Sequence, residues 1–189
     1  FCFSFLFLFL NSDQGMAHAA APAACENKMN HNIAVFEAQQ VDPNAVPLML
    51  DLDGNLCETD TTNVFFVAKG KLYTPGARTV LGGITRKVIF ELAAQLKIDV
   101  IEGDFTPFDM YTADEAFISG TSGTIVPVVS LNSKKIGDSL PGNLTLKIIQ
   151  AWNHLIGLDC VSQAIRHLGD NESKDLLKVW EQRLGAQEN

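Results

Sequence analysis

The stretch NVFFVAKGKLYT, from Asn63 to Thr74, contains two apolar runs separated by a turn. Asn63 to Val67 and Leu72 to Thr74 are short and contain β-branched and aromatic residues, a composition that favours strands. Lys69-Gly70-Lys71 lies between them, and glycine provides the backbone freedom that a tight turn needs. The sequence therefore predicts two successive strands of a meander.

The segments on the N-terminal side extend this pattern. Val46 to Leu52 (VPLMLDL) is an apolar run that suits a buried strand, and Asp53-Gly54-Asn55 after it is typical of a tight turn. Before this strand, Ile33 to Gln40 predicts the end of a helix, which Asp42-Pro43-Asn44 breaks.

The C-terminal side alternates helices and strands. Apolar residues recur at helical spacing after Gly82-Gly83 and predict a helix over 85–97. Beyond it the sequence predicts three strands and two amphipathic helices, namely Ile98 to Ile101, Ala116 to Ser119, Ile125 to Ser130, Leu144 to Leu158 and Ser173 to Leu184. The polar segment Gly120 to Thr124 separates two of the strands. The expected fold class is mixed α/β (α+β).

Composition and charge limit the class of partner. The chain has 189 residues, of which 47% are hydrophobic and 19% charged, and these shares are typical of a globular domain. Fourteen Lys and Arg face twenty-two Asp and Glu, which gives a formal net charge of -8. We therefore expect no nucleic-acid partner, because affinity for the phosphate backbone comes largely from cationic side chains.

The cysteines indicate a reducing compartment. Cys2, Cys25, Cys57 and Cys160 form no C-x-x-C pair, and no histidine lies at ligand spacing from any of them. The sequence therefore predicts no metal site and four independent thiols. Scattered thiols in a chain with substantial apolar segments favour a cytoplasmic location.

The N-terminal segment differs from the rest of the chain. Residues 1–10 read FCFSFLFLFL, a run too short to cross a bilayer, which takes about 20 residues in a helix. Ala19 to Ala24 supplies small residues of the kind found at signal-peptide cleavage sites, so a truncated signal peptide is one interpretation. No basic segment precedes the apolar run, and we therefore expect residues 1–24 to be a non-native or disordered leader, with no membrane partner.

One acidic motif resembles a phosphatase site. Asp51 and Asp53, at the end of a predicted strand, resemble the nucleophile and the general acid of haloacid-dehalogenase-type phosphatases. Asp104 and Asp109 imitate that family's magnesium-binding motif, but Asn55 stands where the family has threonine. The competing interpretation is an Asp-Gly turn after a strand.

A longer series of motifs follows in order. The blocks are LDGNLCE (52–58), TNVF (62–65), LYTP (72–75), LGGITR (81–86), ADEAF (113–117), GTS (120–122) and PV (127–128). Together they resemble the fold-type IV, or class IV, pyridoxal-phosphate-dependent aminotransferases, which include branched-chain and D-amino-acid aminotransferases and aminodeoxychorismate lyase. The resemblance covers about residues 25–150 and stays colinear throughout.

The resemblance implies pyridoxal 5'-phosphate as cofactor. Glu58 matches the acid that faces the ring nitrogen, and the cofactor acts as an electron sink only if a carboxylate keeps that nitrogen protonated. The backbones of Ile84 and Thr85 match the family's phosphate site, and a helix N-terminus supplies N–H donors there. Gly83 before them lets the backbone approach closely, because it has no Cβ.

The second phosphate contact and the substrate contacts come from the polar segment. Thr121 matches the family's phosphate-binding threonine, and Thr121 and Ser122 are candidates for the substrate carboxylate. Arg86, in the first turn of the predicted helix, is interpreted as a structural ion-pair partner.

The catalytic lysine of the family has no match without a gap. An ungapped extension from Glu58 places that position at Ala24, and only a gap would place Lys28 there. We expect the family's smaller N-terminal domain to be absent as well. Residues 25–189 are therefore expected to be the pyridoxal-phosphate-binding, C-terminal large pseudo-barrel domain of the D-amino-acid aminotransferase-like fold.

The resemblance implies that the parent enzyme moves an amino group from an amino acid to a 2-oxo acid, as a branched-chain-like aminotransferase. A homodimer is the implied assembly. An aminodeoxychorismate-lyase-like enzyme is the alternative inside the family. Because Ala24 has no amine, a non-catalytic binding domain is the alternative outside it.

Overall fold

The computed structural model describes residues 6–9, 29–43, 45–122, 124–139, 141–168 and 171–185. Contacts divide the chain into two compact units. The strand unit is Phe3–Ile148, and the helical unit is Ile149–Asn189 with Phe1–Cys2. Each unit is described by itself.

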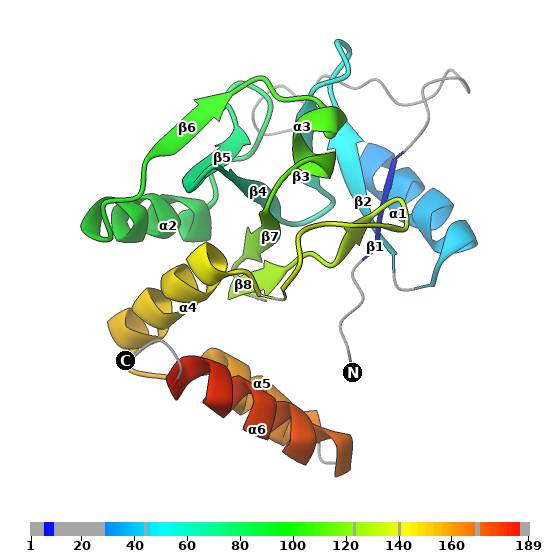
Figure 1. Cartoon of the computed structure of the whole chain (residues 1–189). Helices are drawn as coiled ribbons and strands as arrows, with labels where there is room; N and C mark the ends of the chain where they lie inside the picture. The colour runs from blue at the N-terminus through cyan, green and yellow to red at the C-terminus, as the bar shows by residue number, and fades with distance from the viewer. Residues whose placement is uncertain are drawn as a thin grey trace. The chain divides into compact units, whose positions relative to one another are not determined.

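Figure 1 shows the helices and strands in their order along the chain. In order they are β1 (Leu6–Phe9), α1 (Met29–Val41), β2 (Ala45–Leu50), β3 (Leu56–Thr59), β4 (Asn63–Ala68), β5 (Lys71–Pro75), α2 (Ile84–Gln95), β6 (Val100–Gly103), α3 (Pro107–Tyr111), β7 (Glu115–Gly120), β8 (Thr124–Pro127), β9 (Ser130–Leu131), β10 (Lys134–Lys135), α4 (Asn143–Ile156), α5 (Cys160–Leu168) and α6 (Asn171–Gly185).

Strand β4 is the centre of the sheet. The strand order is β10-β9-β1-β2-β3-β4-β5-β6, and β7 also pairs with β4 and carries β8. β4 runs antiparallel to β3, β5 and β7. β5 and β6 are parallel, and α2 connects them, as a parallel pair requires a crossover. The N-terminus of α2 therefore follows the carboxyl end of β5.

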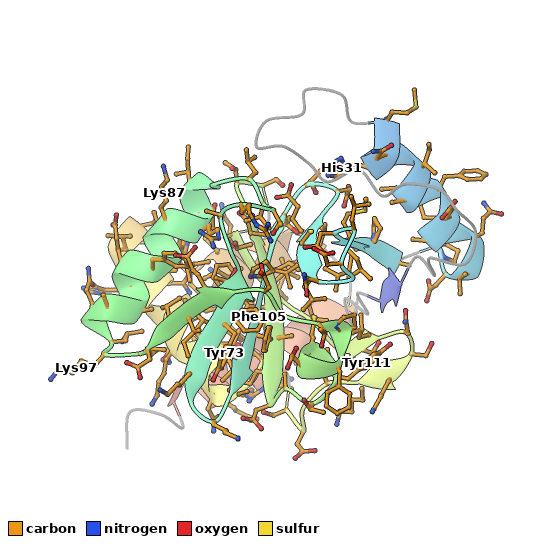
Figure 2. The ribbon with its side chains drawn as sticks, turned by 90° about the horizontal axis from the view of Figure 1, so that it is seen from above. His31, Tyr73, Lys87, Lys97, Phe105 and Tyr111 are labelled. Carbon is orange, nitrogen blue, oxygen red and sulfur yellow. The ribbon has the colours of Figure 1, made fainter. Side chains whose placement is uncertain are left out.

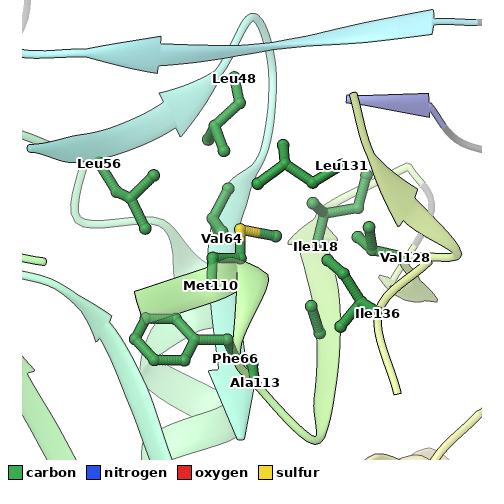
Figure 3. Close-up of a cluster of buried hydrophobic side chains, with 11 residues drawn as sticks. Leu48, Leu56, Val64, Phe66, Met110, Ala113, Ile118, Val128, Leu131 and Ile136 are labelled. Atoms are coloured by element: carbon green, nitrogen blue, oxygen red, sulfur yellow. The ribbon is translucent and has the colours of Figure 1, made fainter. Parts of the chain in front are cut away.

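Both faces of β4 are buried, which explains why its sequence is almost continuously apolar. Val64 and Phe66 belong to a buried cluster with residues of β2, β3, α3 and β7 (Figure 3). Phe65 points to the other face, where it stacks on Phe117 with ring centroids 4.9 Å apart. It also meets Phe90 of α2 edge to face at 6.2 Å, so α2 covers this second face.

An aromatic group extends the first face along β5. Tyr73 stacks on Phe66 at 5.2 Å, and Phe105, in the loop after β6, meets both rings edge to face. Tyr73 and Phe105 lie side by side in Figure 2. Each aromatic pair in these geometries contributes about 0.5–1.5 kcal/mol of stability beyond the contribution from burying its surface. The aromatic content of the predicted meander is thus used for packing between neighbouring strands.

The predicted meander, the predicted helix after Gly82-Gly83 and the predicted strand Ala116 to Ser119 are confirmed. The predicted strand Ile125 to Ser130 is divided between β8 and β9, which pair with different strands. α2 ends earlier than expected, because Leu96 caps it and Lys97 adopts a left-handed backbone angle of φ 57°. The N–H of Ile98 still bonds to Ala93 O of the helix at 2.8 Å, so strand β6 begins two residues later than predicted.

Two differences lie near the chain ends. α4 ends where Gly157 takes φ 69°, and the separate helix α5 that follows was not predicted from the sequence. Within the expected leader, Leu6–Phe9 forms β1 and pairs in parallel with β2 and β9. The rest of residues 1–24 lies outside the described residues, and the leader stays a prediction. None of the described helices is both long and apolar enough to span a membrane.

In the helical unit, Asp159 begins helix α5 and joins it to α6. Its carboxylate accepts from the N–H groups of Val161 and Ser162, from the Ser162 hydroxyl, and from the indole N–H of Trp180 at 3.1 Å. Burial alone would raise the pKa of this carboxyl, but these hydrogen bonds outweigh burial and leave the pKa below its ordinary value of 3.8. The ionised carboxylate therefore stabilises the helical unit.

Acidification is expected to loosen the helical unit. A carboxyl with a lowered folded-state pKa contributes stability that is complete above the unfolded value of 3.8 and is lost as pH falls through the folded value. Both tryptophans, Trp152 and Trp180, belong to this unit, so urea unfolding followed by their fluorescence reports on it. The midpoint should fall below about pH 4 in the unchanged chain. For Asp159→Asn, the urea midpoint at neutral pH should be lower and should change less as the pH falls. Parallel plots of midpoint against pH for the two proteins would contradict this role of Asp159.

Candidate functional site

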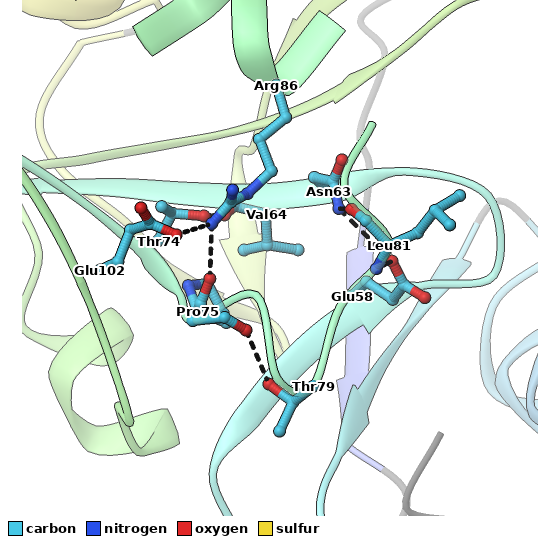
Figure 4. Close-up of polar contacts among 10 residues, drawn as sticks. Glu58, Asn63, Val64, Thr74, Pro75, Thr79, Leu81, Arg86 and Glu102 are labelled. Atoms are coloured by element: carbon cyan, nitrogen blue, oxygen red, sulfur yellow. Dashed lines mark hydrogen bonds and ion pairs between the residues drawn. The ribbon is translucent and has the colours of Figure 1, made fainter. Parts of the chain in front are cut away.

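The candidate site is built where β3 ends and β4 begins. Glu58 and Asn63 face each other in the register of these strands. Oε2 of Glu58 accepts from Leu81 N at 2.9 Å and from the side-chain amide of Asn63 at 3.3 Å. The same amide nitrogen donates to Leu81 O at 2.9 Å (Figure 4). The three residues therefore form a closed ring of hydrogen bonds.

The turn between β3 and β4 keeps this pair in register. The hydroxyl oxygens of Thr59 and Thr62 lie 2.6 Å apart, and the N–H groups of Thr61 and Thr62 donate to the Thr59 hydroxyl. Threonine hydroxyls commonly bond to nearby backbone in turns. The direction of the Glu58 carboxylate is thus fixed by a tight turn on one side and by the ring of hydrogen bonds on the other.

The loop before α2 packs directly on Asn63. A Cβ at Gly83 would lie 2.4 Å from the amide oxygen of Asn63, so this position accepts no side chain without displacing the amide. Gly83 is also the N-cap of α2, and no side chain caps the helix. The first N–H groups of a helix have no partner within it, and they attract anions. The chain therefore places an uncapped helix N-terminus beside the Glu58 ring of hydrogen bonds.

Arg86 fixes the first turn of α2 to the sheet. Its guanidinium is almost fully buried, donates to Pro75 O at 2.8 Å, pairs with Glu102 at 2.7 Å and lies 4.6 Å from the centre of the Phe90 ring. The interpretation of Arg86 as a structural ion-pair partner is confirmed. Because Pro75 ends β5 and Glu102 lies on β6, Arg86 holds the N-terminus of α2 over the ends of both strands.

The turn between β7 and β8 lies against the same strand end. A Cβ at Gly120 would lie 2.8 Å from the methyl group of Thr62, so this glycine too allows a close approach. Thr121 and Ser122 follow it and are exposed. Ser119 before it faces Asn63 in the sheet, and its hydroxyl is buried with no hydrogen-bond partner.

The structure thus gathers most of the predicted site residues around Thr62 and Asn63, where β4 begins. Glu58 bonds to Asn63, Gly83 contacts its amide, and Ile84 and Thr85 begin the helix that follows. Thr121 and Ser122 belong to the turn that packs on Thr62. Ala24 and Lys28 lie outside the described residues, so the lysine position stays a prediction.

The contribution of Asn63 was not recognised from the sequence, where it served only to align a motif. The available indication was a single amide residue at the start of the buried run NVFFV, since buried polar side chains in a strand need partners. Leu81 was missed because it acts through its backbone, which no sequence pattern reports.

The phosphatase-like motif folds into a turn. Asp51 Oδ1 accepts from the N–H groups of Asp53 and Asn55 at 2.9 and 2.8 Å, and Oδ2 accepts from the Asn55 amide at 3.1 Å. Burial opposes ionisation, but these bonds prevail and lower the pKa of Asp51. Asp104 pairs with Arg78, and Asp109 caps α3. Among the described residues, no three His, Cys, Asp or Glu side chains gather as a metal site. This geometry agrees with the Asp-Gly turn.

The cysteine beside Glu58 is not activated. Cys57 lies between Leu56 and Glu58 on β3, and burial, followed by the charge of Asp51, raises its pKa to about 12. A thiol is nucleophilic as the thiolate, so Cys57 stays inert at neutral pH. Cys57 and Cys160 are free thiols, and Cys2 and Cys25 lie outside the described residues.

A sequence model of one protein family, and several proteins of known name, match more than half of this chain. The sequence model of the amino-transferase class IV family matches residues 24–131. A branched-chain-amino-acid aminotransferase of Pseudomonas aeruginosa is 36% identical over 109 residues, which are 58% of this chain and 36% of that protein. A putative branched-chain-amino-acid aminotransferase of Methanocaldococcus jannaschii is 37% identical over 130 residues, which are 68% of this chain and 45% of that protein.

Solved structures agree with these relatives. The branched-chain amino acid aminotransferase of Escherichia coli superposes with a TM-score of 0.71 at 30% identity, over 80% of this chain and 51% of that one. The T.th. branched-chain amino acid aminotransferase, complexed with N-(5'-phosphopyridoxyl)-L-glutamate, gives 0.69 at 26% identity, over 82% and 52%. The chain thus spans about half the length of these structures, and the expected fold-type IV assignment is confirmed. The chain belongs to the class IV aminotransferases.

Proposed function

We propose that this chain forms the pyridoxal-phosphate site of an enzyme that transfers an amino group between an amino acid and a 2-oxo acid. The observation that carries the proposal is the placement of the Glu58 carboxylate and the uncapped N-terminus of α2 against the same side chain, Asn63. A carboxylate and an anion-binding helix end are the two groups that the two ends of this cofactor require.

The residues at the site fit the cofactor chemically. The side-chain amide of Asn63 and the N–H of Leu81 orient Glu58, and the N-cap of α2, Gly83, makes no side-chain bond to the N–H groups at the start of that helix. The side chains of Leu81 and Ile84 are 60% and 76% exposed although both are apolar. The two residues precede and follow Gly82-Gly83 in the chain. Apolar side chains with a few fixed polar groups are typical of sites that hold a flat heteroaromatic ring. Thr121 and Ser122 add exposed hydroxyls from a second turn.

When bound, the cofactor supplies an electron sink that stabilises negative charge on the substrate carbon. Glu58 would hold the proton on the ring nitrogen, because its carboxylate pairs with the cationic form. The N–H groups of Ile84 and Thr85, the Thr85 hydroxyl and the helix dipole would bind the phosphate. Thr121 would donate to the phosphate as well, and Thr121 or Ser122 would orient the substrate carboxylate.

The relatives support a branched-chain amino acid and its 2-oxo acid as substrates, since the matched proteins are branched-chain aminotransferases. Further parts of the proposal rest on the sequence, the cytoplasmic location on its scattered cysteines and the others on the family resemblance. They are a cytoplasmic homodimer, a large domain over 25–189 and a small N-terminal domain that completes the substrate pocket.

Glu58→Gln is expected to weaken binding of ligands that carry the ring nitrogen. Pyridoxamine phosphate is a suitable probe, because it has no aldehyde to react with surface lysines. Losing a charge-assisted bond should lower its affinity about tenfold or more in calorimetric titration. The 1-deaza analogue, which has a C–H in place of the ring nitrogen, should bind both proteins equally. Unchanged affinity for pyridoxamine phosphate would show that Glu58 does not face the ring nitrogen.

Thr85→Val tests the phosphate end of the site. The variant keeps the side-chain volume and loses the hydroxyl, so pyridoxamine phosphate should bind about fivefold more weakly or worse. Pyridoxamine without its phosphate should bind as before. Thr79→Val is the matched control, because the Thr79 hydroxyl bonds to Gly76 O at 3.3 Å and to the Cys57 thiol, and neither group belongs to the proposed phosphate site. Equal losses for both ligands would indicate general damage to the fold.

The unmodified 189-residue chain is expected not to catalyse transamination, because Ala24 occupies the proposed lysine position and carries no amine. Ala24→Lys should let pyridoxal phosphate attach covalently at position 24, and borohydride should make the attachment permanent. Mass spectrometry of the peptide that contains position 24 measures it, with Lys28→Ala as the control. Transaminase turnover by the unmodified chain, or attachment at Lys28 there, would contradict the placement.

A further inference from the structure

Asn63 contacts both ends of the proposed cofactor site. Its amide nitrogen lies 3.3 Å from Glu58 Oε2 and 2.9 Å from Leu81 O (Figure 4). Its amide oxygen faces the space where a Cβ of Gly83 would lie. We propose that Asn63 is a positioning residue that fixes the distance between the ring-nitrogen carboxylate and the phosphate-binding helix end. This inference rests on the proposed function.

The chemistry of a primary amide suits this position. The NH₂ group has two hydrogens, so it can serve the Glu58 carboxylate and the Leu81 carbonyl at the same time. The opposite amide orientation would place an oxygen against these two acceptors. The partners therefore determine the orientation of the Asn63 amide.

Burial makes these bonds specific. Asn63 is only 5% exposed, so water cannot replace a lost partner at low cost. Its backbone is held between β3 and β7, opposite Glu58 and Ser119. The backbone of β4 is therefore fixed at Asn63. If the Asn63 side chain moves, the groups that move with it are the Leu81 loop and the Glu58 carboxylate.

The contact with Gly83 transmits this constraint to the helix. Gly83 caps α2, and its carbonyl accepts from Lys87 N at 3.1 Å. Arg86 holds the same turn to β5 and β6, whereas Asn63 connects it to β3 and β4. A cofactor that spans both ends binds well only if their separation is held to a fraction of an ångström. Asn63 supplies that restraint.

The test compares three ligands on the 189-residue chain by calorimetric titration. Pyridoxamine phosphate uses both ends of the site, pyridoxamine lacks the phosphate, and the 1-deaza analogue of pyridoxamine phosphate lacks the ring nitrogen. Asn63→Ala should weaken each of the three by about fivefold to tenfold, since each end loses one oriented hydrogen bond. By contrast, Glu58→Gln should spare the deaza analogue and Thr85→Val should spare pyridoxamine.

Two further variants address folding and mechanism. Asn63→Leu keeps the approximate shape of the side chain, removes the donors and adds no charge beside Glu58, and it should reproduce the losses if Asn63→Ala is unstable. Gly83→Ala pushes on the Asn63 amide from the loop side, where the Cβ would lie 2.4 Å from its oxygen. It should weaken pyridoxamine, although that ligand has no phosphate to meet Gly83. A role confined to the phosphate would leave pyridoxamine binding unchanged.

Asn55→Ala is the matched control. It removes another amide-to-carboxylate bond, 3.1 Å to Asp51, in the turn before β3. It should lower the thermal unfolding temperature and leave the affinity for all three ligands unchanged.

Each outcome decides between the two proposals. If the unchanged chain does not bind pyridoxamine phosphate, the proposed function fails and this inference fails with it. If the unchanged chain binds and the Asn63 variants bind equally well, only the positioning role is overturned. Losses limited to ligands with the ring nitrogen would show that Asn63 serves Glu58 alone, and the proposed link between the two ends would be wrong.

Discussion

A buried amide must find acceptors for its N–H groups, because leaving them unpaired away from water costs about 1–3 kcal/mol. At the start of β4 this requirement falls on Asn63, and the acceptors come from a strand-end carboxylate and from a loop eighteen residues further along the chain. The requirement brings β3, β4 and the beginning of α2 together. Gly83 and Gly120 allow close contacts at the same strand end, the first with the Asn63 amide and the second with Thr62.

The parts of the fold that local pattern controls were predictable. The β4–β5 hairpin follows from two apolar runs and a glycine turn, and α2 follows from helical spacing after two glycines. β3 was not predicted, because LCET is short and has little pattern, and it forms a strand through its pairing with β2 and β4. The predicted helix Leu144 to Leu158 ends close to the observed end of α4, but no helix was predicted for Cys160–Leu168, where the Asp159 side chain caps α5.

The candidate site was predictable where chemistry and motif order coincide. Glu58, Gly83 and Thr85 were selected because their motif blocks resemble those of a known family, and the structure places them in one neighbourhood. The sequence does not report how they are held, because the bonds of Asn63 and of the Leu81 backbone join residues that are distant in the chain. The family assignment rests on similarity to class IV aminotransferases over more than half of the chain, because a few single residues do not identify a family.

The two adjacent glycines before α2 carry unequal constraints. A Cβ at Gly82 would meet no atom within 4 Å, whereas one at Gly83 would collide with a buried amide oxygen. Neither residue has a positive φ, so the difference arises from space and not from backbone conformation. In a saturation library scored for folding and ligand binding, position 82 would therefore accept many residue types and position 83 would return glycine almost alone. Gly82 and Gly83 look equivalent in the sequence, but only Gly83 lies where a side chain would collide with its neighbour.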